Sequence, residues 1–223
     1  HELVAGLTGA GLAAAGPSVL LWEGWRKVII GLGFSTLLGF TLSIILMTAL
    51  YWIFRRTRPS MVRNIFSKLQ MASAAFMAFS HGSNDGQKFM GVFALVLVMG
   101  GITTEFTIPI WVMVLCGLVM GLGTATGGWR IIRTMGFKLT KLEPVNGFAA
   151  ETSAGLSILV ASIFGIPLST THTINISIMG VGATRRFSAV RWGVAGNIVA
   201  AWILTFPVCG ALGYFYSWLL NLI

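Results

Sequence analysis

The chain has 223 residues, of which 56% are hydrophobic and 9% are charged, against about 25% charged residues in ordinary soluble domains. Six acids and fifteen bases cannot form the polar shell of a water-soluble globule of this size, so most of the surface must face lipid. The net charge of +9 would suggest nucleic-acid binding in a soluble protein. In a membrane protein, the positions of the bases indicate instead which loops face the cytoplasm.

In chain order, the apolar stretches predict an all-α polytopic membrane protein. Four of them are long enough, or nearly so, to cross about 30 Å of hydrocarbon as helices. They cover residues 28–54, 69–99, 108–127 and 192–220. Two more stretches, 3–21 and 145–183, are interrupted at Gly16-Pro17 and at Gly165-Ile166-Pro167, where proline removes a backbone donor and breaks the helix. The second interruption predicts two short helices that meet inside the membrane.

The stretch 69–99 contains a polar segment, residues 80–88, which cannot face lipid. We therefore expect a broken helix here as well. Gly82 would permit the break, and Ser83 and Asn84 would cap the helix that restarts after it. The restarted helix would offer free backbone N–H groups to an anion.

The basic residues predict the orientation of the chain in the membrane. Twelve of the fifteen bases fall in three connections. These are Arg55, Arg56, Arg58, Arg63 and Lys68; Arg130, Arg133, Lys138 and Lys141; and Arg185, Arg186 and Arg191. If the stretch 145–183 enters the membrane and returns, all three connections share one side, which the positive-inside rule makes the cytoplasm. We therefore expect a multi-pass protein of the cell membrane that binds no nucleic acid and has its C-terminus outside.

An internal repeat suggests two halves of opposite orientation. Two histidines are followed by two glycines at the same offsets. These are His1 with Gly9 and Gly11, and His172 with Gly180 and Gly182. The segment 26–31 also resembles 191–196, and inverted repeats with broken or re-entrant helices are typical of secondary transporters. The sequence thus divides into the end of a first repeat (1–54), a basic cytoplasmic loop (55–68) and a second repeat (69–223).

The polar segment 80–88 contains candidate cation ligands. Asn84 and Asp85 supply hard oxygen atoms suited to a cation such as Na⁺, and an ionisable residue in the membrane interior is a functional candidate by default. Two alternatives stay open. Asp85 and Lys88 could neutralise each other at a capped kink, or His81 and Asp85, at i and i+4, could bind a metal ion.

Three consecutive hydroxyl groups follow the second proline break, at the start of a new helix. They belong to Ser169, Thr170 and Thr171. Together with free backbone N–H groups they could replace the hydration of a tetrahedral oxyanion such as phosphate or sulfate, unless they bond back to their own helix. Glu151, among small residues of the preceding helix, could hold a cation or a proton. Its alternative role is an interfacial acid beside Lys141.

Two motifs in this chain have a specific pattern. They are His-Gly-Ser-Asn-Asp-Gly-Gln-Lys-Phe-Met-Gly at 81–91 and Gly-Ile-Pro-Leu-Ser-Thr-Thr-His at 165–172. The pair closely resembles the second-repeat signatures of the inorganic phosphate transporter (PiT) family, and the continuation Gly-Gln-Lys-x-Met-Gly is similar to the bacterial branch. The resemblance covers nearly the whole chain, so that His1 looks like the end of a first-repeat motif and the sequence looks like a fragment.

The resemblance implies a secondary transporter that carries inorganic phosphate together with Na⁺ or H⁺ by alternating access and needs no cofactor. It places substrate-binding groups at Ser83, Asn84, Asp85, Gln87, Ser169, Thr170 and Thr171. It places cation ligands at Asn84, Asp85 and Glu151, with Asp85 as the Na⁺ ligand. A substrate or proton role falls to His81, Lys88 and His172. Expected partners are phosphate, the coupling ion and the lipid bilayer, and a homodimer is one assembly open to the protein.

Lys88 departs from the family pattern, because many relatives have a small neutral residue there, and this puts Na⁺ coupling in question. Other functions stay open beside phosphate symport. A sulfate permease could use the same scaffold, since sulfate has the same shape. His81, Asp85 and Ser169 could serve an intramembrane hydrolase, although no nucleophile elbow or metal-ligand set accompanies them. A passive anion channel could also use these polar groups.

Overall fold

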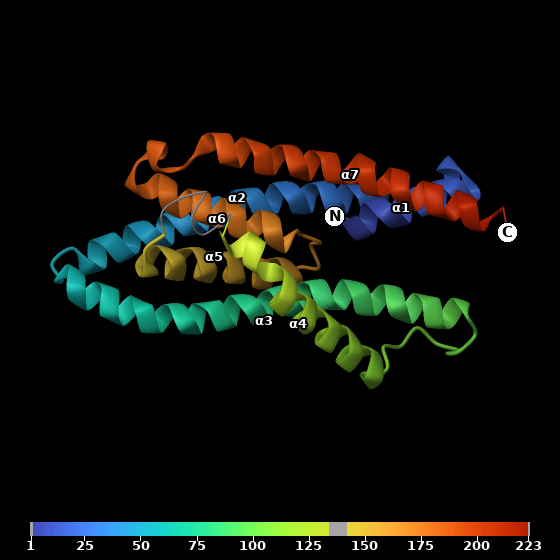
Figure 1. Ribbon diagram of the computed structural model, residues 1–223, viewed down its shortest axis with the longest axis horizontal. Coiled ribbons are helices and arrows are strands. Elements are labelled where there is room, and N and C mark those ends of the chain that lie inside the picture. Colours follow the sequence, from blue (N-terminus) through green and yellow to red (C-terminus); the bar gives the residue numbers. More distant parts are fainter. Residues whose placement is uncertain (1, 134–141, 223) are drawn as a thin grey trace.

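Every regular element in the computed structural model, which describes residues 2–133 and 142–222, is a helix. The elements are α1 (Glu2–Ala15), η1 (Pro17–Val19), α2 (Trp22–Phe54), α3 (Pro59–Met99), α4 (Ile110–Arg133), α5 (Pro144–Ile163), α6 (Thr170–Arg185), η3 (Phe187–Ala189) and α7 (Trp192–Leu220). Figure 1 shows α2, α3 and α7 along the long axis of the molecule and α4 inclined to it. The predicted all-α class is confirmed.

Three of the described helices are long and apolar enough to cross a membrane. They are α2, residues 110–129 of α4, and α7, which correspond to three of the four predicted spans. Large apolar side chains on them point away from the protein: Leu37 is 71% exposed, Leu122 67% and Leu204 61%. Such a surface is stable against lipid hydrocarbon but costly in water. The chain is therefore a membrane protein.

The predicted break between α5 and α6 is present. α5 ends in a Schellman motif, in which Gly165 has φ +62° and the N–H of Ile166 donates to the carbonyl oxygen of Ala161 at 2.9 Å. Pro167 prevents the helix from continuing, and α6 starts directly after its N-cap, Ser169. The connection lies near the middle of the long axis of the molecule (Figure 1).

The predicted break within the stretch 69–99 is wrong. α3 is one continuous helix of 41 residues, and the polar segment 80–88 lies inside it. No restarted helix offers free N–H groups in this described segment. Gly82 keeps its own N–H and costs a helix only about 1 kcal/mol relative to alanine. The polar side chains need no break either, because Asn84, Asp85 and Lys88 find partners on α5, on α6 and on the segment between these helices.

Two further boundaries can be compared with the sequence predictions. The interruption at Gly16-Pro17 is present, since Gly16 has φ +72° and α1 ends before it. The basic segment 55–68 is a loop only as far as Pro59, where α3 begins, because the fixed φ of proline suits the first helical position. Some residues used in the predictions lie outside the described residues: His1, Lys138 and Lys141.

The short helices α1 and α6 have similar positions, since each packs along one long helix. Both start near the middle of the molecule and run towards opposite ends of it (Figure 1). α1 packs along α7, and α6 packs along α2. Each contact is tight at a glycine: a Cβ atom on Gly9 would collide with the carbonyl group of Gly210, and one on Gly180 with the Ser43 hydroxyl. Close contact at these glycines therefore fixes both short helices.

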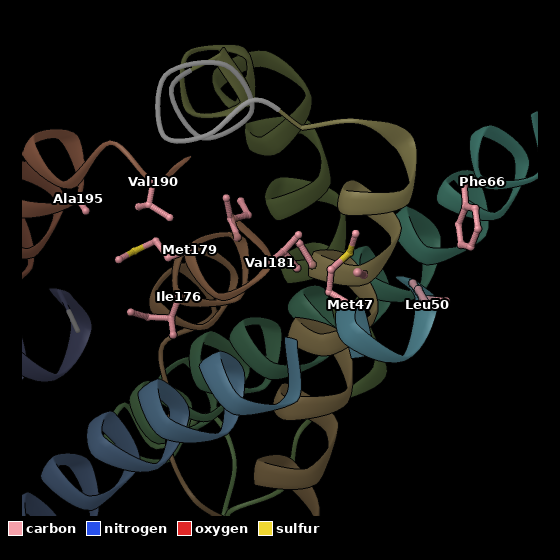
Figure 2. Packing of buried hydrophobic residues seen from close by; sticks show 11 residues of the cluster. Met47, Leu50, Phe66, Ile176, Met179, Val181, Val190 and Ala195 are labelled. Carbon is pink, nitrogen blue, oxygen red and sulfur yellow. The ribbon is translucent and has the colours of Figure 1, made fainter. Parts of the chain in front are cut away.

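A hydrophobic cluster holds α2, α3, α5 and α6 together. Figure 2 shows Met47 of α2, Val181 of α6 and the ring of Phe66 of α3. Phe66 is 1% exposed and makes edge-to-face contacts with Phe54 at 5.2 Å and with Phe148 at 5.3 Å between ring centroids. These contacts fix α3 against α2 and α5, and thereby the direction in which the polar segment of α3 points.

Candidate functional site

Asp85 lies at the centre of a polar cluster between α3 and α6. Its Oδ1 is 2.8 Å from Nζ of Lys88, one turn further along α3. Its Oδ2 accepts a hydrogen bond from the Thr170 hydroxyl at 2.9 Å and lies 3.5 Å from Nδ1 of His81. The two motifs found in the sequence therefore meet at one carboxylate.

Lys88 connects α3 to the non-helical segment before α6. Its Nζ donates to the backbone carbonyl oxygen of Leu168 at 2.9 Å. The side chain of Lys88 is 34% exposed and that of Asp85 23%, so the ion pair is partly shielded from solvent, and its attraction is stronger than that of a surface pair. The two charges of the pair balance each other, and both side chains remain partly accessible to solvent.

A pocket of about 550 Å³ adjoins this cluster, between α1, α3, α6 and α7. Its lining contains Asp85, Lys88, Ser169, Thr170, Thr171 and His172, together with Glu2, Leu3, Gly6, Leu7, Phe89, Trp202 and Thr205. The first N–H groups of a helix have no acceptor within the helix, so the start of α6 adds backbone donors and a positive dipole end to the pocket. With the Lys88 ammonium and the hydroxyls, these groups can bind an oxyanion.

Several predicted site residues of α3 lie outside this pocket. Ser83 and Gln87 are exposed and are not among the lining residues. Asn84 is buried at the contact with α5, where its Nδ2 donates to Oγ of Ser162 at 3.0 Å. Within the described part of the chain, its Oδ1 has no hydrogen-bond donor, so one buried oxygen is left for a cation or a water molecule. His81 touches Asp85 but does not line the pocket.

Glu151 occupies a separate position on the same α3–α5 contact. The Ser73 hydroxyl donates to its Oε2 at 2.5 Å. Ser73 precedes Asp85 by twelve residues on α3, which corresponds to about 18 Å along the helix axis. The structure therefore does not bring Glu151 and Asp85 into one cation site.

Trp202 is a site residue that the sequence predictions missed. Its ring stacks on the His172 ring, with centroids 3.7 Å apart and an angle of 28° between the planes, and it lines the pocket. Its position in the middle of an apolar span is a usable signal, because tryptophans that anchor a protein at the membrane interface lie near the ends of spans. The sequence predictions also missed the backbone carbonyl of Leu168 and the hydroxyl of Ser162. Nothing in the local sequence marks either of these groups as part of a site.

The metal-site alternative has little support in the structure. Across residues 2–133 and 142–222, no three side chains of the His, Cys, Asp and Glu types lie together as a metal site would require. His81 and Asp85 thus have no third ligand of these types nearby.

Comparisons with known proteins agree with one another. The family model described as "Phosphate transporter family" matches residues 1–213. A probable low-affinity inorganic phosphate transporter of Rhizobium meliloti (strain 1021) is 47% identical over 219 residues, which cover 96% of this chain and 66% of that protein. A protein of the same description in Bacillus subtilis (strain 168) is 38% identical over 224 residues, which cover 100% of this chain and 67% of that protein.

Similarity also extends to a mycobacterial protein and to a solved structure. A probable low-affinity inorganic phosphate transporter of Mycobacterium leprae (strain TN) is 38% identical, and 55% of its length is covered. The chain thus spans between about half and two thirds of these relatives. A structure described as "The sodium-dependent phosphate transporter" matches with a TM-score of 0.88 and 24% identity, over 99% of this chain and 72% of that one. At that identity the match shows a shared fold.

Proposed function

Because the chain belongs to the phosphate transporter family, whose members are transporters and not enzymes, we propose that it carries inorganic phosphate across the cell membrane. Relatives of 38–47% identity are described as probable low-affinity inorganic phosphate transporters. The proposal extends that substrate to this chain, which covers about two thirds of those two proteins.

The observation that carries the proposal is the pocket at the start of α6. A tetrahedral oxyanion requires several inward-facing hydrogen-bond donors and a compensating positive charge. The pocket offers the hydroxyls of Ser169, Thr170 and Thr171 and the ammonium group of Lys88. The Thr170 hydroxyl donates to Asp85, and we expect it to turn to a phosphate oxygen when the substrate binds.

Coupling to a cation follows from the charge of the same pocket. Asp85 borders it with its charge balanced by Lys88, so the negative charge of a bound phosphate is repulsive to the carboxylate unless further positive charge accompanies the anion. We propose that Na⁺ or H⁺ supplies this charge during transport, with Asn84, Asp85 and Glu151 as its candidate ligands at more than one position. Ser83 and Gln87, which are exposed in this structure, would reach the substrate only in another conformation.

We also propose that transport proceeds by alternating access between two inverted repeats. Supporting this, α1 and α6 run in opposite directions from the middle of the molecule (Figure 1) and make corresponding glycine contacts with α7 and α2. The α5–α6 hairpin would then be re-entrant, the basic connections would be cytoplasmic, and the C-terminus would lie outside.

The proposal is tested by radiolabelled phosphate uptake into proteoliposomes that contain the full-length protein. An imposed Na⁺ gradient and an imposed pH gradient are compared, with unlabelled sulfate at equal and at excess concentration in parallel. We expect concentrative phosphate uptake, driven by one of the gradients and resistant to sulfate. Block by an equal concentration of sulfate would assign the pocket to sulfate instead, and uptake that no gradient drives would contradict cation coupling.

Asp85→Asn tests the role of the pocket carboxylate. The substitution keeps the shape of the side chain but removes the charge that faces Lys88 and Thr170, so we expect phosphate uptake to fall by roughly tenfold or more, about 1.4 kcal/mol. Glu105→Gln, at an exposed acid between α3 and α4, is the matched control and should retain uptake. Wild-type uptake in Asp85→Asn at normal membrane levels would contradict the assignment.

A further inference from the structure

Lys88 is held by oxygen atoms of the kind that bind alkali cations. Its Nζ lies 2.8 Å from a carboxylate oxygen of Asp85 and 2.9 Å from the backbone carbonyl oxygen of Leu168. One oxygen belongs to α3 and the other to the non-helical segment before α6. Carboxylate and unwound backbone carbonyl oxygens are hard ligands of the kind that bind monovalent cations in broken-helix transporters.

The Leu168 carbonyl is available because of the break before α6. It follows Pro167 and precedes the N-cap Ser169, so it belongs to neither helical ladder. Asp85 is fixed on its other side by the Thr170 hydroxyl at 2.9 Å and by His81 at 3.5 Å. The two oxygen atoms of this site, from Asp85 and Leu168, thus come from the two sequence motifs. The ammonium group of Lys88 lies between them.

We propose that Lys88 is a tethered substitute for a monovalent coupling ion, whose ammonium group occupies the cation position between Asp85 and Leu168. An ammonium group has the same charge as Na⁺ and bonds to the same oxygens, but it cannot leave the protein. This position therefore does not admit Na⁺ in the wild-type protein. The consequence for transport is that any exchangeable coupling ion is bound elsewhere or is a proton. This consequence rests on the proposed function.

Removal of the ammonium group should convert this position into a Na⁺ site. In Lys88→Met the Asp85 carboxylate and the Leu168 carbonyl lose their cation, and the partly buried carboxylate is left uncompensated. A ligand that binds only the folded state raises the unfolding temperature. We therefore expect the full-length Lys88→Met protein to be less stable than wild type in choline chloride and to recover stability in sodium chloride.

The experiment measures the thermal unfolding midpoint of the full-length protein in detergent without phosphate, in NaCl and in choline chloride at equal ionic strength. We expect replacement of choline by Na⁺ to raise the midpoint of Lys88→Met by at least about 2 °C more than that of wild type. Lys68→Met removes an exposed lysine of the same helix and should respond like wild type. The double variant Asp85→Asn/Lys88→Met lacks the carboxylate and should lose the added response.

A Na⁺ response of Lys88→Met no larger than that of wild type would overturn the proposal, as would an added response that persists in the double variant. If Lys88→Met is not recovered as folded protein, Lys88→Gln serves the same comparison, since its amide still donates to Leu168 while leaving Asp85 without a cation. Stability is measured without phosphate, so this result is independent of the uptake assay. Failure of wild-type uptake would count against the proposed function and not against the ammonium-filled site.

Discussion

Glu151 and Asp85 illustrate, at the scale of single residues, two ways of holding a carboxylate inside a helical membrane protein. Asp85 contacts the ammonium group of Lys88 at 2.8 Å, whereas Glu151 accepts a hydrogen bond from the Ser73 hydroxyl at 2.5 Å. A hydroxyl stabilises a carboxylate less than an opposite charge does, so Glu151 is better placed to exchange a proton or a cation.

Ser73→Ala should therefore destabilise the protein. The hydroxyl donates to a partly buried carboxylate, and loss of such a donor costs about 1–3 kcal/mol, or a fall of roughly 2–4 °C in the unfolding midpoint per kcal/mol. Ser67→Ala, on the same helix, removes an exposed hydroxyl that bonds only back to its own helix at Arg63 and should change the midpoint little. Thermal unfolding of the full-length protein in detergent checks both, and equal midpoints for the two variants would contradict the role of Ser73.

The side chains of this site could be predicted from the sequence, and the Asp85–Lys88 pair within one helix was among the alternatives, but the partners on other segments could not be predicted. A polar segment in an apolar stretch marks Asn84, Asp85 and Lys88 without any knowledge of the fold. Their contacts with Ser162, Thr170 and Leu168, however, join positions 78 to 85 residues apart. Such contacts depend on how α3, α5 and α6 pack, and this packing leaves no local pattern in the sequence.

At the scale of helices, a proline interrupted the helix as predicted, whereas a glycine in a polar segment did not. The break between α5 and α6 was predictable because Pro167 acts locally, by removing a donor and blocking the preceding turn. The continuity of α3 was not predictable, because it depends on partners that α5, α6 and the segment between them supply to Asn84, Asp85 and Lys88. A Cβ atom added to Gly82 would meet no other atom within 4 Å, so this glycine marks neither a turn nor a close approach.

Alanine substitutions at Gly82 and Gly165 should shift stability in opposite directions. Gly82→Ala adds a methyl group in open space within a continuous helix and should stabilise the protein by roughly 0.5–1 kcal/mol. Gly165→Ala places a side chain at φ +62° and should cost about 1–2 kcal/mol. Unfolding midpoints of the two variants check this, and a destabilising effect of Gly82→Ala would count in favour of a break in α3.

At the scale of the whole molecule, the basic residues distinguish one end from the other. The short connection after α2 and the one that contains η3 lie at one end, and the connection between α3 and α4 lies at the other (Figure 1). The first end carries Arg55, Arg56, Arg185 and Arg186, while the segment 100–109 contains no basic residue. By the positive-inside rule, this difference in basic residues predicts that the first end is cytoplasmic.

Cysteine labelling can test the resulting orientation. In a background where Cys116 and Cys209 are replaced by alanine, single cysteines are introduced as Thr104→Cys and Ser188→Cys, both at exposed positions. We expect a membrane-impermeant maleimide added to intact cells to modify Thr104→Cys only, and Ser188→Cys to react after permeabilisation. Modification of Ser188→Cys in intact cells would reverse the proposed topology.

The contact between α1 and α7 also sets an order of events during synthesis. α1 starts at residue 2 and α7 at residue 192, and the two helices are in close backbone contact at Gly9 and Gly210. At about 5–20 residues per second, roughly 10 to 40 s pass between the synthesis of α1 and that of the helix it packs against. Throughout this interval α1 lacks α7, its main partner among the described helices, so the pocket that α1 and α7 help to enclose is completed only when α7 has entered the membrane.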